Sequence, residues 1–246
     1  MSLEESERLA AFVASMPPAY RRSFDLEATR AHAGVVDRRG ASGTHVEIWK
    51  ELSERVFAIC VVADDKPGLL SSISAALVEN RIDVVSADAY CRTRPDGAIE
   101  AVDFLWIRRL PNGKGTSSPI RAKDILALAN AIENASANVE AHMPEVAPVA
   151  SGGSSARIKF DTSDGATVLT VEAVDRPGLL LAVTQALFRA GVQIIGLRAT
   201  TENGCAIDRF QLAEKNGQPL RNHRLLELQE HVLGALDDGM PLRKSG

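Results

Sequence analysis

Apolar residues in the first half of the chain alternate between strand spacing and helix spacing. Short apolar, β-rich runs predict strands, and apolar stripes that recur every three to four residues predict helices. The expected strands lie at 55–63, 82–90 and 99–109, a last short strand fits 138–143, and the helices lie at 66–80 and 118–134. A turn of sequence Arg-Pro-Asp-Gly joins the second and third strands.

The second half repeats this order of elements. Its strands are predicted at 166–174, 192–200 and 206–214, and its helices at 176–190 and 220–239. The apolar helix positions Leu69 and Ile73 recur as Leu179 and Val183, 110 residues later (179 − 69 = 110). The order β-α-β-β-α is present twice, with a closing strand expected only in the first half. It is that of the ferredoxin-like (βαββαβ) arrangement, so we predict an α+β fold.

Composition divides the chain into four parts. A stretch rich in Pro, Gly, Ser and Ala predicts a linker at 144–155, between one domain at 45–143 and another at 156–246. Residues 1–44 are interpreted as a helical N-terminal segment. Its first helix ends at the Pro-Pro pair, and its second short helix ends at Gly40.

Charge and composition exclude several classes of function. Hydrophobic residues make up 45% and charged residues 24% of the chain, as in soluble globular proteins. The net charge of −4 offers no basic field to nucleic acid or to an anionic membrane, and no apolar run approaches the ~18 residues that span a bilayer. The acidic N-terminus argues against a targeting signal. The three cysteines are far apart in the sequence, so we expect neither a zinc site nor a disulfide, and a cytoplasmic location.

The strongest candidate for binding chemistry is a motif that occurs twice. Asp-Lys-Pro-Gly-Leu-Leu occupies 65–70 and Asp-Arg-Pro-Gly-Leu-Leu occupies 175–180, each between a strand and a helix. The first amides of a helix lack partners within it and suit a carboxylate, while glycine lets the backbone approach a ligand. An aspartate can accept a hydrogen bond from an ammonium group, so the motif suits an amino acid. The candidate contacts are Asp65, Gly68, Leu69 and Leu70 in the first motif and Asp175, Gly178, Leu179 and Leu180 in the second.

A purely structural interpretation stays open for both motifs. Asp65 and Asp175 can simply cap the helices, because aspartate is a favoured N-cap worth ~1 kcal/mol, and Pro-Gly can be only a tight turn. The sequences that follow differ, Arg81-Ile-Asp83 in one repeat and Gly191-Val-Gln193 in the other. We therefore expect two sites of unequal affinity.

A strand that ends in aspartate, followed by basic-Pro-Gly-Leu-Leu at a helix start, resembles the ACT family of small-molecule sensors. Residues 157–180 and 206–212 are similar to the last domain of the bacterial nitrogen-sensing uridylyltransferase/uridylyl-removing enzymes, and residues 15–32 resemble the segment before their ACT pair. The resemblance implies two ACT domains that bind an amino acid, with glutamine as the first expectation. It also implies that the next strand of the paired module completes each site, at Asp83 and at Gln193.

The catalytic domains of those enzymes have no counterpart in this sequence. No His-Asp pair occurs, and the five histidines are scattered over termini, linker edges and helix surfaces, so we expect no metal, no cofactor and no enzymatic activity. Asp103 and Asp208 occupy matching places in the third strands, and we assign them to the sheet surface or to turns. Trp49 and Trp106 are interpreted as packing or interface residues.

Two classes of function remain. The first is a non-catalytic regulatory protein that senses an amino acid and modulates a partner protein. The alternative is a scaffold that has lost its ligand and uses the ACT pair only for dimerisation or docking. In both cases we expect a homodimer, because an uncovered sheet edge invites pairing, and neither nucleic acid nor membrane as a partner.

Overall fold

The computed structural model describes residues 3–40, 43–52, 55–111, 118–137, 156–163 and 166–237. The predicted linker at 144–155 and the short strand expected at 138–143 lie outside this part of the chain. The helices are α1 (Leu3–Ser15), α2 (Pro18–Ser23), α3 (Leu26–Arg39), α4 (Leu69–Glu79), α5 (Ala122–Ala137), α6 (Leu179–Arg189) and α7 (Asn222–Asp237). The strands are β1 (Thr44–Glu51), β2 (Phe57–Asp64), β3 (Ile82–Thr93), β4 (Ile99–Arg109), β5 (Arg157–Ser163), β6 (Ala166–Val174), β7 (Gln193–Glu202) and β8 (Cys205–Ala213).

The strands of the described residues join in one antiparallel sheet of eight strands, in the order β1-β2-β4-β3-β7-β8-β6-β5. This order is palindromic, because each strand of the first half has its counterpart at the mirrored place in the second half. The halves meet where β3 pairs with β7, from Ser86 opposite Thr200 to Tyr90 opposite Gly196. The predicted α+β class with two ferredoxin-like halves is confirmed.

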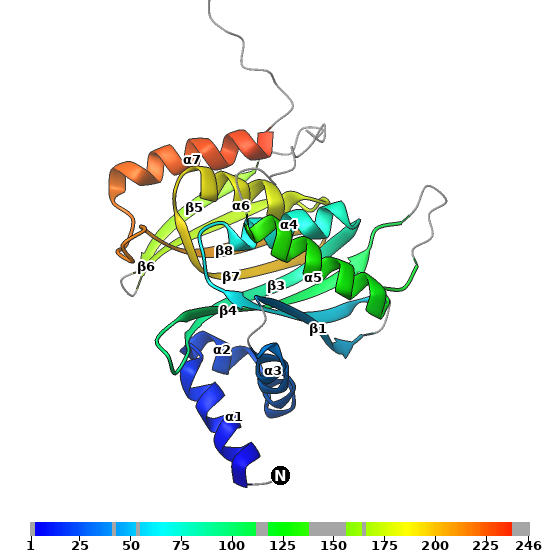
Figure 1. Cartoon of the computed structure of the whole chain (residues 1–246). Coiled ribbons are helices and arrows are strands. Elements are labelled where there is room, and N and C mark those ends of the chain that lie inside the picture. Colours follow the sequence, from blue (N-terminus) through cyan, green and yellow to red (C-terminus); the bar gives the residue numbers. More distant parts are fainter. Residues whose placement is uncertain are drawn as a thin grey trace, which may run out of the picture.

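Helices cover the two faces of the sheet unequally (Figure 1). On one face, α4 to α7 cover both halves, whereas on the other face α1 to α3 lie beneath the first half. The burial of the strands follows from this arrangement. In β2, which has helices on both sides, every residue before Asp64 is buried, whereas in β6 buried and half-buried residues alternate from Ala166 to Glu172.

Two strands were not predicted from the sequence. The strand β1 pairs with β2, and β5 pairs with β6, so each forms an outer strand of the described sheet. The helices after both motifs also begin later than predicted, at Leu69 and Leu179, because the Pro-Gly pair forms the turn before each helix.

An aromatic cluster fills the space between α1–α3 and the sheet. The side chains of Tyr20, Phe24, Phe104 and Trp106 pack there, together with His32. The prediction that the histidines lie at surfaces was wrong for His32, which is fully buried and hydrogen-bonded through Nδ1 to the Tyr20 hydroxyl at 2.9 Å. Burial lowers the pKa of His32 to about 3, so the ring is neutral and structural. The packing role predicted for Trp106 agrees with this cluster.

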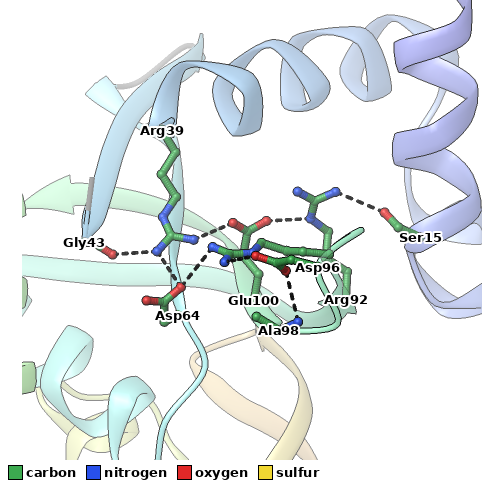
Figure 2. A network of polar contacts seen from close by, with 9 residues as sticks. Ser15, Arg39, Gly43, Asp64, Arg92, Asp96, Ala98 and Glu100 are labelled. Atoms are coloured by element: carbon green, nitrogen blue, oxygen red, sulfur yellow. Dashed lines mark hydrogen bonds and ion pairs between the residues drawn. The ribbon is translucent and has the colours of Figure 1, made fainter. Parts of the chain in front are cut away.

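A polar network ties the N-terminal helices to the first half of the sheet (Figure 2). Arg39, at the end of α3, forms ion pairs with the buried Glu100 and with the exposed Asp64, and it donates to the Gly43 carbonyl. On the other side of Glu100, Arg92 donates through Nε at 2.6 Å, and its Nη1 donates to Ser15 of α1 at 3.1 Å. Both helices are therefore held by side chains of β2, β3 and β4.

Candidate functional site

Two hollows lie where the halves of the sheet meet, beside the β3–β7 junction. Site 1 lies between the turn at 65–71 and the start of β7, and site 2 lies between the turn at 175–181 and the start of β3. Each site therefore takes its turn from one half of the chain and its strand from the other half.

Site 1 brings together all the residues expected to act with the first motif. Asp65, Gly68, Leu69 and Leu70 line it from the turn, and Gln193 lines it from β7. Burial raises the pKa of the Asp65 carboxyl, and hydrogen bonds with the Cys91 thiol and the Gln193 side chain oppose this rise. The aspartate of one repeat thus contacts the strand of the other.

Site 2 has the same plan with a more acidic lining. Asp175, Gly178, Leu179 and Leu180 line it from the turn, and Asp83 lines it from β3. The carboxylate of Asp83 accepts from Arg108 Nη2 at 2.8 Å and from Nε at 3.0 Å. Burial raises the pKa of Asp83, Arg108 opposes this rise, and the nearby Asp175 adds to it. In this site the contributing strand already holds an ion pair.

The aspartates of the two motifs do not cap the helices. The N-cap residues are Gly68, at φ 81°, and Gly178, at φ 84°, and neither helix start has a side-chain cap hydrogen bond. Asp65 and Asp175 lie three residues earlier, where each strand ends. This geometry removes the capping alternative, and it explains the glycines, because a left-handed backbone conformation is unfavourable for residues with a Cβ.

The backbone amides of the two turns are partly engaged. The amide of Leu69 donates to the Lys66 carbonyl at 3.1 Å, and that of Leu179 donates to the Arg176 carbonyl at the same distance. The amides of Gly68 and Leu70, and their counterparts in the second turn, are thus the better placed donors for a carboxylate.

Two further carboxyl groups belong to the sites, although the sequence assigned them elsewhere. Asp103 lines site 1 and Asp208 lines site 2, and both are 4% exposed, so their assignment to the sheet surface or to turns was wrong. Burial, followed by the charge of Asp65, raises the pKa of Asp103 to about 8. Burial and Asp175 likewise raise the pKa of Asp208 to about 7. Asp103 and Asp208 occupy corresponding positions in the two repeats, and this repetition is the sequence feature that points to a shared role in the two sites.

Other kinds of site find no support in the described part of the chain. Among the residues that the structure describes, no group of three or more His, Cys, Asp or Glu side chains could hold a metal ion. No helix in the same residues is long and apolar enough to cross a membrane. The cysteines Cys60, Cys91 and Cys205 are free thiols.

Comparison with known proteins identifies relatives over nearly the whole chain. The chain is 26% identical over 257 residues to the bifunctional uridylyltransferase/uridylyl-removing enzyme of Rhodospirillum rubrum, an alignment that covers 96% of this chain and 27% of the relative. It is 30% identical over 234 residues to the enzyme of the same name from Gluconobacter oxydans, covering 89% of this chain and 24% of the relative. The predicted resemblance is confirmed, and the chain spans about a quarter of the length of these relatives.

Two other comparisons add less. A solved structure titled as a putative glycine cleavage system transcriptional repressor is 15% identical, covers 74% of this chain and has a TM-score of 0.25. No family model matches the chain.

Proposed function

We propose that this chain is a regulatory protein without catalytic activity that senses a small ligand, an amino acid, at sites 1 and 2. The observation that carries the proposal is the composition of each site. A buried or half-buried carboxyl group, a helix start and a strand from the opposite half converge on one hollow. Each end of an amino acid finds a suitable group there.

The ligand's ammonium group would be held at the acidic end of each site. In site 1 Asp65 accepts from it and Asp103 adds negative charge, and in site 2 Asp175 and Asp208 have these roles. Bringing a cation to a carboxyl group with a raised pKa favours the charged form of that group, so binding would release protons near neutral pH.

The ligand's carboxylate would lie at the helix start. The amides of Gly68 and Leu70, or of Gly178 and Leu180, would donate to such a group, and the positive end of the helix dipole would stabilise it. Gln193 in site 1 and Asp83 in site 2 then contact the remainder of the ligand. Glutamine is our first choice, since the chain resembles nitrogen-sensing enzymes.

Binding at such a site would act on the junction between the halves. A ligand held by the turn of one half and the strand of the other would stabilise one arrangement of β3 against β7. If the protein has two such arrangements, the ligand shifts the equilibrium between them only by the difference in its affinity for each. This arrangement suits a protein that modulates a partner or its own assembly. We propose a cytoplasmic homodimer, in keeping with the free thiols and the outer edge strands β1 and β5.

A ligand-free scaffold is the second candidate. It is favoured by the ion pair between Arg108 and Asp83, which fills part of site 2 with the protein's own charges. In that case the ACT pair serves only for dimerisation or docking.

Thermal unfolding in the presence of each of the twenty amino acids distinguishes the two candidates. A ligand at one hundred times its Kd stabilises the folded state by about 2.7 kcal/mol per site, which raises the Tm by a few degrees. Asp175→Ala should lose the part of this gain that comes from site 2, and Asp65→Ala the part from site 1. If millimolar concentrations of all twenty amino acids leave the Tm of the wild-type chain unchanged, the scaffold remains.

A further inference from the structure

Site 1 continues outward into a second depression. The residues that line both hollows are Pro67, Phe188, Val192 and Gln193. The outer depression is also lined by Arg189, the last residue of α6, and by Lys215, in the turn after β8. All its charged lining residues are therefore basic, in contrast to the acidic inner end of site 1.

The two cations of the outer depression face it without carboxylate neighbours of their own. In the described part of the chain, neither Arg189 nor Lys215 takes part in an ion pair, whereas the adjacent Glu214 is engaged with Arg224 at 3.8 Å. Lys215 crosses over Gly191, since a Cβ at that glycine would lie 3.6 Å from Lys215 Cε and 3.9 Å from Nζ. Glycine at this place lets the ammonium group reach the start of β7.

The charges along site 1 are thus separated. Asp65 and Asp103 lie at the inner end, next to the exposed Lys66 of the turn, and Arg189 and Lys215 lie at the outer end, with Gln193 lining both hollows. A ligand that follows this order carries an ammonium group inside and a second anionic group outside. The helix start at Gly68 remains available for its α-carboxylate.

Site 2 lacks this outer basic pair. The helix position that corresponds to Arg189 is Glu79 (189 − 110 = 79), and the position that corresponds to Lys215 is Leu110 (215 − 105 = 110). The offset of 105 applies to the fourth strand of each half, because Asp103 in β4 corresponds to Asp208 in β8 (208 − 103 = 105). The strand pairing gives the same offset, since Asp83 lies opposite Arg108 and its counterpart Gln193 lies opposite Ala213 (213 − 108 = 105). One cation is replaced by an anion and the other by an apolar side chain. Site 2 has other cations nearby, but Arg81, at the position of Gly191, donates to the Pro111 carbonyl and Arg108 is paired with Asp83.

We propose that site 1 selects an amino acid with an anionic side chain, such as a dicarboxylic amino acid, and that site 2 does not. The inference rests on the proposed function, because it assigns side-chain specificity to a site that binds an amino acid. The two sites would then bind different amino acids, and one with a neutral amide side chain, such as glutamine, would bind at site 2.

Titration calorimetry of the full chain carrying Asp175→Ala, which weakens site 2, tests this specificity. L-glutamate and L-glutamine are the two probes, because they share length and backbone and differ in side-chain charge. We expect L-glutamate to bind several-fold more tightly than L-glutamine at low salt, and we expect 0.5 M NaCl to reduce that preference. Adding Arg189→Gln and Lys215→Gln should weaken L-glutamate binding by about two- to thirtyfold, since exposed ion pairs contribute ~0.2–1 kcal/mol each. L-glutamine binding should stay the same.

Lys159→Gln is the matched control, because Lys159 is an exposed cation on the outer strand β5 and lines neither site. It should leave both affinities unchanged. Equal affinities for the two probes, or equal losses of both in the double variant, overturn the charge selectivity while leaving amino-acid binding in place. If neither probe binds and no other amino acid does, both the selectivity and the proposed function are wrong. Unfolding curves of each variant confirm that loss of binding is not loss of fold.

Discussion

Asp103 is the residue that most directly couples the protonation of a site to the stability of the fold. Its carboxyl group has a pKa raised to about 8 by burial and then by Asp65. The folded state therefore binds a proton that the unfolded state releases between about pH 4 and pH 8, so this group's contribution to the free energy of unfolding decreases as the pH rises through that window.

Asp103→Asn should remove this dependence, because asparagine resembles the protonated aspartate in shape and carries no charge. We expect the variant to be more stable than the wild type at pH 8, by a few kcal/mol, and close to it at pH 4. Urea unfolding at several pH values measures the difference. Asp96→Asn is the control, since Arg94 lowers the pKa of this exposed carboxyl and it titrates below the window. A variant that follows the wild-type curve at every pH would contradict the assigned pKa.

Single residues also show what the sequence could and could not predict. The placement of Asp65 beside Gln193 came from the resemblance to ACT domains, because local spacing says nothing about which strand of another repeat lies nearby. Burial of Asp103 depends on long-range pairing with β2 and β3, which a strand pattern does not contain. His32 is different, since it shares a helix face with the buried Thr29 and Val36, and that periodicity was visible in the sequence.

At the scale of elements, the two turns that precede α4 and α6 depend on their glycines. Gly178 adopts φ 84° at the start of α6, and this conformation costs residues with a Cβ about 1–2 kcal/mol. Gly178→Ala should lower the free energy of unfolding by about that amount and weaken amino-acid binding at site 2.

Gly234→Ala provides the opposite control. Gly234 lies inside α7, and a Cβ there would have no atom within 4 Å, so alanine should stabilise the helix by about 0.5–1 kcal/mol. Chemical denaturation of both variants measures whether each substitution lowers or raises the free energy of unfolding. Equal effects of both substitutions would show that the left-handed turn is not the source of the cost.

Prediction of elements was most reliable where apolar runs were long and regular. The central strands and the helices that cover them follow such runs, whereas β1 and β5 at the edges of the sheet do not. In β5 only Ile158 and Phe160 alternate with polar residues, a period-two signal too short to predict a strand. The β1 sequence places charged residues between Val46, Ile48 and Trp49 and so lacks a clear apolar pattern, although α3 and α5 both contact this outer strand.

For the molecule as a whole, the polar network in Figure 2 joins the N-terminal helices to Asp64 and Arg92, which are sequence neighbours of residues in site 1. Asp64 directly precedes the ligand-binding candidate Asp65, and Arg92 directly follows Cys91, which hydrogen-bonds with Asp65. The corresponding positions in the second half are Val174 and Glu202, so this set of charges is not repeated (174 − 64 = 110, 202 − 92 = 110). This adjacency predicts that a change at site 1 reaches α1 and α3 through Arg39 and Glu100.

Arg39→Met tests how much this network holds. The side chains of Arg39 and Glu100 are each 3% exposed, so removing the cation leaves a buried carboxylate with less compensation, and we expect a loss of roughly 3 kcal/mol in the free energy of unfolding. The neighbouring Arg38→Met is a matched control, because its ion pair with Glu47 joins side chains that are 53% and 34% exposed and contributes about 0–1 kcal/mol.

Hydrogen exchange of α3 then distinguishes a structural network from a signalling one. If site 1 communicates with the helices, a bound amino acid should slow amide exchange in α3 of the wild type and of Arg38→Met, and it should not do so in Arg39→Met at a concentration that saturates site 1. Ligand-dependent protection that persists in Arg39→Met would mean that the signal reaches α3 by another route. Protection absent from all three proteins would leave Arg39 as an anchor of the N-terminal helices alone.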